Sequence, residues 1–462
     1  MCGIAAFATT KKNTSCLGTI ISLLIELQHR GQEASGIATV AKDGTAHTYV
    51  SKGTIFDLLG MSSLLETMTV DAFGVIGHTR YSTSGGYGDS EAQPIVVGND
   101  SSFRIAVAFN GTIANYKQIA KELGIKNCRS DVTVLSEAIR KLALESGKDV
   151  VEALKTLSSI VIGGYSAVVL TSEPRLVIAR DPRGFRPLSY AYNGEEFVAA
   201  SETSALEVLG YDDWVEVPAG GIISYDGKSV EVVTAPGECP TPCAFEYVYI
   251  ARLDSVFNGV SVYGVRLGLG YELSKRDSAE VDVVVPVPDS GRAAALGYSR
   301  GRGVPLEEGL VVNRYLGRGF IMPPGMREII AKLKYGFVRS AVSEKRVALV
   351  DDSIVRGTTM AAIASRLKHI GAREVHVRIS SPPFRYPCFM GVDVASRKEL
   401  LAWRTMNLGD VACMLNADSV AFNNVETLAK VIGLPSACLA CFTGRYPFKG
   451  LTVDDLENMF SR

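Results

Sequence analysis

The chain has 462 residues, with 48 lysines and arginines against 49 aspartates and glutamates, so its formal net charge is −1. This balance excludes nucleic-acid binding as the primary function, because that function needs a strongly basic surface. The length exceeds what one hydrophobic core supports and predicts two or three domains. No apolar run approaches the roughly 18 residues that cross a bilayer, and Lys11 and Lys12 end the early apolar stretch too soon for a signal peptide. We therefore expect a cytoplasmic protein with no membrane or nucleic-acid partner.

Nine cysteines are distributed along the chain. An odd number in a cytoplasmic protein argues against a disulfide framework and favours catalysis or metal binding. Cys16, Cys128 and Cys413 stand in amphipathic or apolar stretches, and we expect them to be inert packing residues.

The chain opens with the letters MCGIAAF, which place a thiol at Cys2. An N-terminal cysteine can be both nucleophile and base, because its own α-amine, with a pKa of about 8, can take the thiol proton. That chemistry requires removal of Met1, which a small second residue permits. The alternative is that Cys2 only starts a buried strand.

Residues 2–233 are predicted to form many short strands and two helices, and they make up the first domain. The helices are predicted over residues 18–28 and 131–145, where apolar side chains recur at helical spacing. Strands are predicted over residues 103–109, 165–171 and 176–179, between turns rich in Gly, Asn and Asp. Residues 234–243 hold three prolines in ten residues, which predicts a linker.

Residues 244–462 are predicted to form a second domain with a parallel sheet. Residues 281–287 and 346–350 are nearly continuous apolar runs, typical of strands that are buried on both faces. A helix is predicted over residues 359–370 and a strand over residues 374–379. Strand, helix and strand at this spacing indicate a βαβ unit.

The strongest local motif, VALVDDSIVRGTT, joins that strand to that helix at residues 347–359. A helix N-terminus favours a phosphate, and the hydroxyls of Thr358 and Thr359 add donors. The two carboxylates of Asp351 and Asp352 fit a phosphorylated polyol together with a divalent cation. The chain has no Walker motif. The alternative is an ordinary strand-to-helix turn with a capping residue.

The motif resembles the phosphoribosylpyrophosphate (PRPP) loop of the type I phosphoribosyltransferases. The resemblance implies that the acids hold the ribose and, with Mg²⁺, the diphosphate region, while the turn holds the 5′-phosphate. The implied PRPP-binding residues in the loop are Asp351, Asp352, Ser353, Arg356, Gly357, Thr358 and Thr359.

Two other segments of the second domain resemble parts of the same family. The string VPVPDSG at residues 285–291 resembles the segment that wraps the diphosphate, so Ser290 joins Asp351 and Asp352 at the implied magnesium site. Residues 313–322, followed by Arg327 and Lys334, resemble the mobile loop that closes over PRPP. Basic residues there, Lys334 among them, would neutralise the leaving diphosphate.

Three strings in the first domain resemble the glutaminase domain of the N-terminal-nucleophile amidotransferases. They are HRGQEASGI at residues 29–37, GHTRYST at residues 77–83 and FNGTIANY at residues 109–116. With Cys2 at the chain start, they imply a class II glutamine amidotransferase domain.

The resemblance assigns roles to four further residues of that domain. Arg80 would bind the α-carboxylate of glutamine and Asp131 its α-amine, while the Asn110 side chain and the Gly111 N–H would form the oxyanion hole for Cys2. A zwitterionic substrate needs one fixed cation and one fixed anion, and an oxyanion needs two donors. The alternatives are a hairpin turn at Asn110-Gly111 and a helix N-cap at Asp131.

Together the two halves resemble the glutamine PRPP amidotransferase family over almost the whole chain. The implied fold is an N-terminal-nucleophile (Ntn) hydrolase αββα sandwich followed by a type I phosphoribosyltransferase parallel-sheet domain. The implied reaction hydrolyses glutamine at Cys2 and transfers ammonia to C1 of PRPP, giving 5-phosphoribosylamine, glutamate and diphosphate, the first committed step of purine synthesis. The resemblance also implies a homo-oligomer (dimer or tetramer) and feedback inhibition by purine nucleotides. One position departs from the family pattern: Leu253 stands where the family usually has proline.

Four further cysteines form a possible metal-binding set. Cys438 and Cys441 make a C-x-x-C pair near the C-terminus, and Cys243 and Cys388 lie far upstream. The residues alone also allow a redox pair or a structural zinc site. The resemblance implies one structural [4Fe–4S] cluster on these four cysteines, remote from the chemistry, with Cys239 as the nearest substitute ligand.

Two other functions fit parts of the sequence. A related glutaminase, such as a glucosamine-phosphate or asparagine synthetase, would share the first half but lack the DDSIVRGTT loop. A PRPP-sensing regulator would keep that loop but has no need of Cys2, Arg80 and Asn110.

Overall fold

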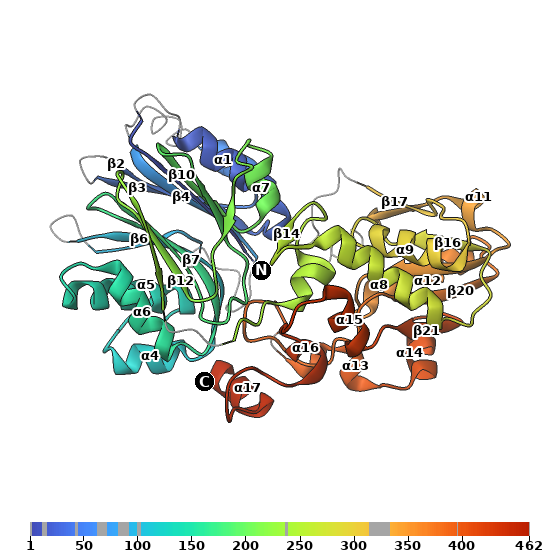
Figure 1. The fold of residues 1–462 in the computed structure, drawn as a ribbon. Coiled ribbons are helices and arrows are strands. Elements are labelled where there is room, and N and C mark those ends of the chain that lie inside the picture. Colours follow the sequence, from blue (N-terminus) through green and yellow to red (C-terminus); the bar gives the residue numbers. More distant parts are fainter. Residues whose placement is uncertain are drawn as a thin grey trace.

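The computed structural model describes residues 2–11, 16–41, 45–61, 72–81, 92–98, 103–235, 239–313, 333–394 and 396–461. Two halves of the chain lie side by side, and strand β1 begins at the boundary between them (Figure 1). Within the described ranges, no helix combines the length and the apolar character that a membrane crossing requires.

The first half contains two antiparallel sheets that face one another. Among the described residues, seven strands form one sheet in the order β11-β9-β10-β1-β4-β2-β3, and six form the other in the order β13-β12-β8-β7-β6-β5. The strands of the first sheet are β1 (Gly3–Thr9), β2 (Ala34–Ala41), β3 (Ala46–Lys52), β4 (Ala72–Arg80), β9 (Ser189–Tyr192), β10 (Glu196–Ala200) and β11 (Val215–Glu216). The strands of the second are β5 (Ile95–Val97), β6 (Ile105–Ile113), β7 (Gly163–Thr171), β8 (Arg175–Arg180), β12 (Gly221–Tyr225) and β13 (Val230–Thr234).

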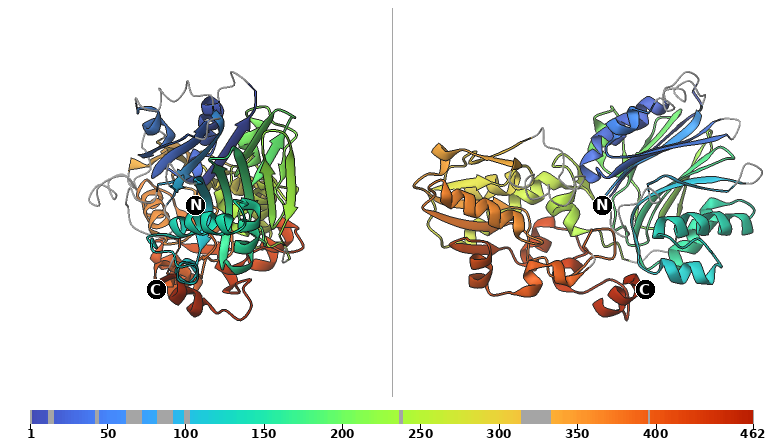
Figure 2. Two further views of the ribbon diagram at one scale, coloured as in Figure 1. Left: turned by 90° about the vertical axis from the view of Figure 1, so that its left-hand side faces the viewer. Right: turned by 180° about the vertical axis from the view of Figure 1, so that it is seen from behind.

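Helices cover the outer faces of both sheets, which gives the predicted αββα sandwich (Figure 2). Between the sheets, Ile4 and Ala6 of β1 share a buried cluster with Val168 of β7. The first sheet is covered by α1 (Cys16–Glu26), the 3₁₀ turn η1 (Gln28–Arg30), α2 (Ile55–Leu59) and α7 (Thr203–Glu207). The second is covered by α4 (Tyr116–Glu122), α5 (Asp131–Glu145) and α6 (Val150–Ile160).

The predicted elements of this half agree with the structure in part. The helix predicted over residues 131–145 is α5, and the one predicted over residues 18–28 is α1, which starts two residues earlier. The prediction of two helices was too low, because α6 follows α5 directly and α2, α4 and α7 are helical as well. Cys16 is buried and Cys128 half-buried, but Cys413 is exposed, so the prediction that it packs inside was wrong.

The second half is built on a parallel sheet with strand order β16-β19-β20-β21 in the described residues. Its strands are β16 (Val283–Pro286), β19 (Arg346–Asp351), β20 (Glu374–Ile379) and β21 (Ser419–Phe422). Helix α12 (Thr358–His369) connects β19 to its parallel neighbour β20, as predicted. Helices α8 (Val262–Arg276) and α9 (Arg292–Arg302) cover one face of the sheet, and α12 and α14 (Leu408–Met414) cover the other.

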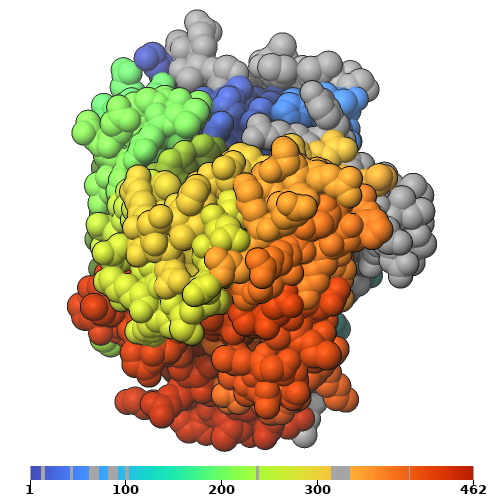
Figure 3. All heavy atoms as spheres, turned by 90° about the vertical axis from the view of Figure 1, so that its right-hand side faces the viewer, coloured from blue at the N-terminus to red at the C-terminus, as the bar shows by residue number. Residues whose placement is uncertain are grey.

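Smaller elements complete this half. They are η3 (Glu246–Ile250), β14 (Val256–Phe257), β15 (Val260–Ser261), β17 (Leu310–Val312), β18 (Tyr335–Phe337), α11 (Arg339–Val342), η5 (Arg397–Glu399), α13 (Leu401–Arg404), α15 (Val425–Ile432), α16 (Ala440–Thr443) and α17 (Val453–Ser461). Figure 3 views this end of the molecule, where α8 and α9 (yellow-green to yellow) lie above the C-terminal part of the chain (red).

The two halves share a buried core. Ala114 and Phe185 of the first half belong to the same apolar cluster as Phe245 and Met390 of the second. The predicted linker runs along the first half, since Thr241 N–H donates to Arg183 O (2.7 Å) and Cys243 N–H to Phe185 O (3.3 Å). Residues that are far apart in the sequence are therefore in direct contact across this boundary.

Candidate active sites

Cys2 lies at the start of β1 and is held by groups from three other segments. Its side chain and backbone are buried, with 6% of the residue exposed. The Cys2 N–H donates to Asn110 Oδ1 (3.1 Å), and its carbonyl accepts from Arg30 Nε (2.9 Å). The thiol lies 3.5 Å from the carbonyl oxygen of Tyr81, which follows β4. The thiol is therefore held in place although it stands at the start of the chain.

Asn110 and Gly111 lie within β6, so the alternative of a hairpin turn is wrong. They pair with Ser166 and Tyr165 of β7. Because Asn110 Oδ1 accepts from Cys2, its Nδ2 is the free end of the amide, and this atom is buried with no hydrogen-bond partner among the described residues. At Gly111 a Cβ would lie 2.0 Å from Gly164 O, so only glycine fits.

Arg80 and Asp131 each lie at the end of an element, Arg80 at the end of β4 and Asp131 at the start of α5. Arg80 ends β4, whose residue Thr79 pairs with Gly3 beside Cys2. Asp131 opens α5, but Ser130 is the N-cap, so Asp131 is not the cap that the alternative supposed. The Asp131 carboxylate accepts instead from Val132 N–H (2.9 Å) and from Ile113 N–H of β6 (3.2 Å).

Behind Cys2 lies a buried network of charges that the sequence analysis did not identify. Arg30 is fully buried and donates to Glu202 (2.5 Å) and, through two nitrogens, to Glu246 (2.9 and 3.1 Å). Glu202 also accepts from His29 Nε2 (2.7 Å). Burial alone raises the pKa of Glu202, but the charges and hydrogen bonds of His29 and Arg30 hold this pKa well below its usual value.

This network crosses the boundary between the halves. Glu246 belongs to η3 in the second half and also accepts from Arg186 Nη1 (3.1 Å). Glu202 accepts from the Arg252 N–H (2.9 Å) and the Ser255 hydroxyl (2.7 Å). The sequence signal was that Arg30 lies in the HRGQEASGI string, but no spacing rule pairs it with Glu202 or Glu246, which are more than 150 positions away.

The predicted PRPP loop lies where β19 ends and α12 begins. Asp352 N–H donates to Asp351 Oδ1 (2.9 Å), and the Ser353 hydroxyl donates to Asp352 Oδ1 (2.6 Å). Gly357 has φ +84°, the left-handed conformation that the turn into α12 requires. Arg356, Thr358 and Thr359 are exposed, although Arg356 Nε now pairs with Glu399 (3.0 Å).

Two more predicted residues lie near this loop. Ser290 follows β16, the parallel neighbour of β19, so both strands end at the same edge of the sheet. A Cβ on the next residue, Gly291, would lie 3.1 Å from Asp351 Cα. Partial burial and the Asp352 charge raise the pKa of Asp351 well above its usual value, whereas the nearby Lys334 ammonium lowers it. Residues 314–332, including most of the predicted mobile loop with Arg327, lie outside the described residues.

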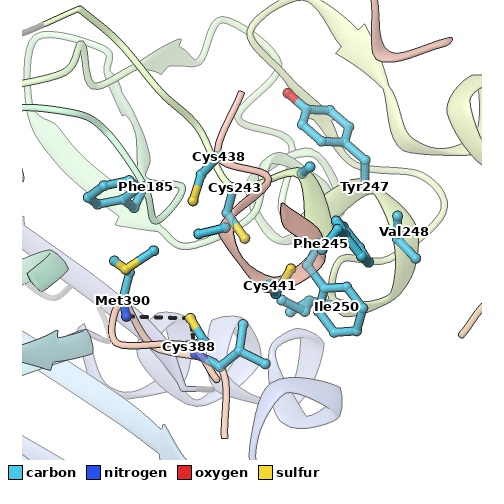
Figure 4. Close-up of a cluster of buried hydrophobic side chains, with 14 of the residues drawn as sticks. Phe185, Cys243, Phe245, Tyr247, Val248, Ile250, Cys388, Met390, Cys438 and Cys441 are labelled. Carbon is cyan, nitrogen blue, oxygen red and sulfur yellow. Dashed lines mark hydrogen bonds between the residues drawn. The ribbon is translucent and has the colours of Figure 1, made fainter. Parts of the chain in front are cut away.

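Cys243, Cys388, Cys438 and Cys441 come together at the boundary between the halves. All four are buried in one apolar cluster and none is in a disulfide. Their side chains surround a common region (Figure 4). Cys243 forms a β-bridge with Cys438, and the Cys388 sulfur accepts from the N–H groups of Met390 and Val392 (both 3.4 Å). Cys239 is exposed and does not belong to this buried cluster.

The loop that carries Cys388 is not remote from the predicted oxyanion hole, contrary to expectation. A Cβ on Gly391 would lie 3.0 Å from Gly111 Cα, and a Cβ on Gly164 would lie 3.1 Å from Met390 Cβ. The cysteine loop therefore packs directly against the backbone behind Asn110 and Gly111.

Comparisons with known proteins agree with both halves. A glutamine amidotransferase domain model matches residues 78–208. The chain is 39% identical to the amidophosphoribosyltransferase of Methanothermobacter thermautotrophicus, over 96% of this chain and 94% of that one. It is 40% identical to the amidophosphoribosyltransferase of Bacillus subtilis, over 92% of this chain and 90% of that one.

Solved structures give the same result. A glutamine PRPP amidotransferase from B. subtilis, complexed with ADP and GMP, superimposes with a TM-score of 0.85 and is 34% identical. The match covers 98% of this chain and all of that one. The chain belongs to the amidophosphoribosyltransferase family.

Proposed function

We propose that residues 2–233 form a glutaminase domain and that residues 244–462, joined to it by residues 234–243, form the domain that aminates PRPP. Ammonia released from glutamine attacks C1 of PRPP, the C1–O bond to diphosphate breaks, and the nitrogen loses a proton. The products are 5-phosphoribosylamine, glutamate and diphosphate. The buried boundary between the halves supports direct transfer of ammonia between the two sites.

Cys2 is the proposed nucleophile of the glutaminase. With Met1 removed, its α-amine takes the thiol proton, the sulfur attacks the amide carbon, and the proton passes to the departing ammonia. Water then hydrolyses the thioester and restores the thiol. The observation that carries the proposal is the buried Asn110 Nδ2, which has no partner among the described residues and adjoins Cys2 through the same amide group. A donor left unpaired in this way is ready for an oxyanion, with the Gly111 N–H as the second donor.

Arg80 and Asp131 are proposed to bind the two charged ends of glutamine. Arg80 would pair with the α-carboxylate and Asp131 with the α-amine. Their positions at the ends of β4 and α5, beside the strands that carry Cys2 and Asn110, support these roles.

The PRPP loop is proposed to bind PRPP together with Mg²⁺. Adjacent carboxylates such as those of Asp351 and Asp352 suit a cation that keeps several waters and also binds substrate phosphates. Ser290 would complete the magnesium contacts, and Lys334 would neutralise charge on the leaving diphosphate. The α12 N-terminus, with exposed Thr358 and Thr359, would hold the 5′-phosphate.

We also propose that Cys243, Cys388, Cys438 and Cys441 hold one [4Fe–4S] cluster with a structural role. A tetrahedral zinc ion binds each sulfur at about 2.3 Å and draws all four close together. In a cluster each thiolate binds a different iron, so the sulfurs stand farther apart. Four buried thiols around one region support the proposal.

Regulation and assembly are proposed from the relatives. The B. subtilis structure is described as complexed with ADP and GMP, which supports purine nucleotides as feedback inhibitors here. A homo-oligomer, a dimer or a tetramer, and a cytoplasmic location stay predictions from the sequence.

Replacing the nucleophile tests the proposed function. Cys2→Ser should abolish glutamine-dependent synthesis of phosphoribosylamine, because the hydroxyl is a much weaker nucleophile. Synthesis from high external ammonia should continue, because the PRPP site is intact. Equal loss of both activities would contradict two separate sites, and unchanged glutamine-dependent activity would contradict Cys2 as the nucleophile.

A further inference from the structure

Arg186 is a fully buried cation with hydrogen-bond donors left over. It lies in the turn that follows β8, and its Nη1 donates to Glu246 (3.1 Å). Its Nε and Nη2 atoms are buried and have no hydrogen-bond partner among the described residues. Leaving charged donors unpaired inside a protein is costly. The protein part of this region therefore lacks an acceptor that the guanidinium needs.

The side chain of Arg186 lies between two of the cysteine segments. Its neighbour Phe185 accepts from the Cys243 N–H (3.3 Å) and lies beside Met390 in Figure 4. A Cβ on Gly391, three residues after Cys388, would lie 3.3 Å from Arg186 Cδ.

A cluster at these cysteines would need a positive counter-charge. Four thiolates and an oxidised [4Fe–4S] core carry a net charge of about −2, and the surrounding side chains are largely apolar. A buried charge is stable only when it is paired. Arg385, whose backbone N–H donates to Cys441 O, has one buried nitrogen without a partner among the described residues, its Nε, but the residue is only half-buried. Arg186 is fully enclosed and has two such nitrogens.

We propose that Arg186 is the counter-charge and hydrogen-bond donor of the cluster. Its Nε and Nη2 groups donate to cluster or cysteine sulfur on the side of Cys243 and Cys388, while Nη1 stays on Glu246. This inference rests on the proposed cluster. It adds a residue that binds the cofactor without ligating iron, and it joins the cluster to the Glu246–Arg30 pairs behind Cys2.

The test compares Arg186→Met with a matched control, Arg180→Met, in anaerobically purified full-length protein. Arg180 is also buried, with an unpartnered Nε, but its other nitrogens donate to Glu216 (2.7 Å) and to the Val217 and Gly184 carbonyls (2.8 Å each). The readouts are iron and sulfide per chain and the midpoint potential of the cluster from a redox titration followed by electron paramagnetic resonance. Loss of a nearby positive charge makes reduction harder, so Arg186→Met should lower the potential. We expect at least a tenfold change in the ratio of oxidised to reduced cluster, about 59 mV, and no shift in Arg180→Met.

Two further variants keep the test decisive. Arg186→Lys restores the charge and should bring the potential back toward the wild-type value, and Arg186→Gln, also neutral, replaces Arg186→Met if that chain does not fold. Wild-type potentials in the neutral variants, or an equal shift in Arg180→Met, would overturn the role of Arg186. Wild-type protein without iron would instead contradict the proposed cluster itself, so the two failures are distinguishable.

Discussion

At Asn110 the two polar atoms of one amide have separate tasks. Oδ1 accepts from the Cys2 N–H and fixes the amide plane, whereas Nδ2 stays buried and unpartnered among the described residues. The proposed oxyanion donor is therefore oriented before substrate binds, and no reorganisation is needed when charge develops.

Asn110→Ala should lower the kcat of glutamine hydrolysis by about 10²–10³-fold with little change in KM, because the lost donor acts mainly in the transition state. Steady-state glutaminase assays measure this. Asn115→Ala is the matched control, since the Asn115 amide uses both polar atoms on backbone groups of Ile160 and Ile162 (2.8 Å each). It should lower stability but not the kcat of the folded enzyme. An unchanged kcat in Asn110→Ala, or an equal loss in both variants, would contradict the oxyanion role.

His78 makes stability depend on pH. Burial, and then the Arg80 charge, lower the pKa of His78 to about 3 in the folded chain, against about 6.5 when unfolded. Between these values the unfolded chain binds a proton that the folded chain does not, so stability is full above about pH 6.5 and falls as the pH drops toward 3. His78→Met should reduce this loss by about 1.4 kcal/mol per pH unit. Urea denaturation at stepped pH measures it, and parallel pH profiles for the two chains would show that His78 does not titrate this way.

At the scale of elements, the proposed PRPP site depends on two parallel strands that end at the same edge of the sheet. Asp351→Asn and Asp352→Asn should each weaken PRPP binding in the presence of Mg²⁺ by about 1.5–3 kcal/mol, because each removes a charged contact. Calorimetry measures the affinity. Asp282→Asn is the control, since Asp282 precedes β16 at the opposite edge of the sheet and pairs with Arg346. If both loop variants kept wild-type affinity, the loop would not be the PRPP site.

Elements with a clear period or a strong capping pattern were predictable from the sequence. The apolar spacing of residues 131–145 gave α5 without error, and the strand–helix–strand pattern around the DDSIVRGTT loop gave β19, α12 and β20. Helix α6 was missed, although Asp149 caps it with its carboxylate (2.8 Å to Val151 N–H). Helix α6 has only 11 residues and follows α5 directly, so its short apolar pattern was not separated from the longer pattern of α5.

The polar groups behind the sites were not predictable in the same way. Arg30 stands in a recognisable string, but its partners Glu202 and Glu246 come from segments that only the tertiary fold brings next to it. Burial decides what these charges do, and a sequence shows burial only where a hydrophobic period exists. The contact of Gly391 with Gly111 could not be predicted either, because no sequence pattern indicates which two glycines are neighbours in the fold.

For the whole molecule, the two halves depend on a shared set of charges. Glu246→Gln should destabilise the protein by about 3–5 kcal/mol, because it leaves the buried Arg30 and Arg186 without their common carboxylate. Denaturant unfolding, followed by probes in each half, measures the loss. Glu280→Gln is the control: its pair with Arg346 is exposed to solvent, so stability should change little. A loss confined to one half would contradict a shared network.

The contact between the cysteine loop and Gly111 has a consequence for growing cells. If the proposed cluster is absent and the loop at residues 388–392 moves, the backbone behind the proposed oxyanion hole should move with it, because Gly391 packs against Gly111. Release of nitrogen from glutamine would then fail earlier than use of free ammonia. Iron supply would thus limit how fast nitrogen enters nucleotides, although the proposed role of the cluster is structural.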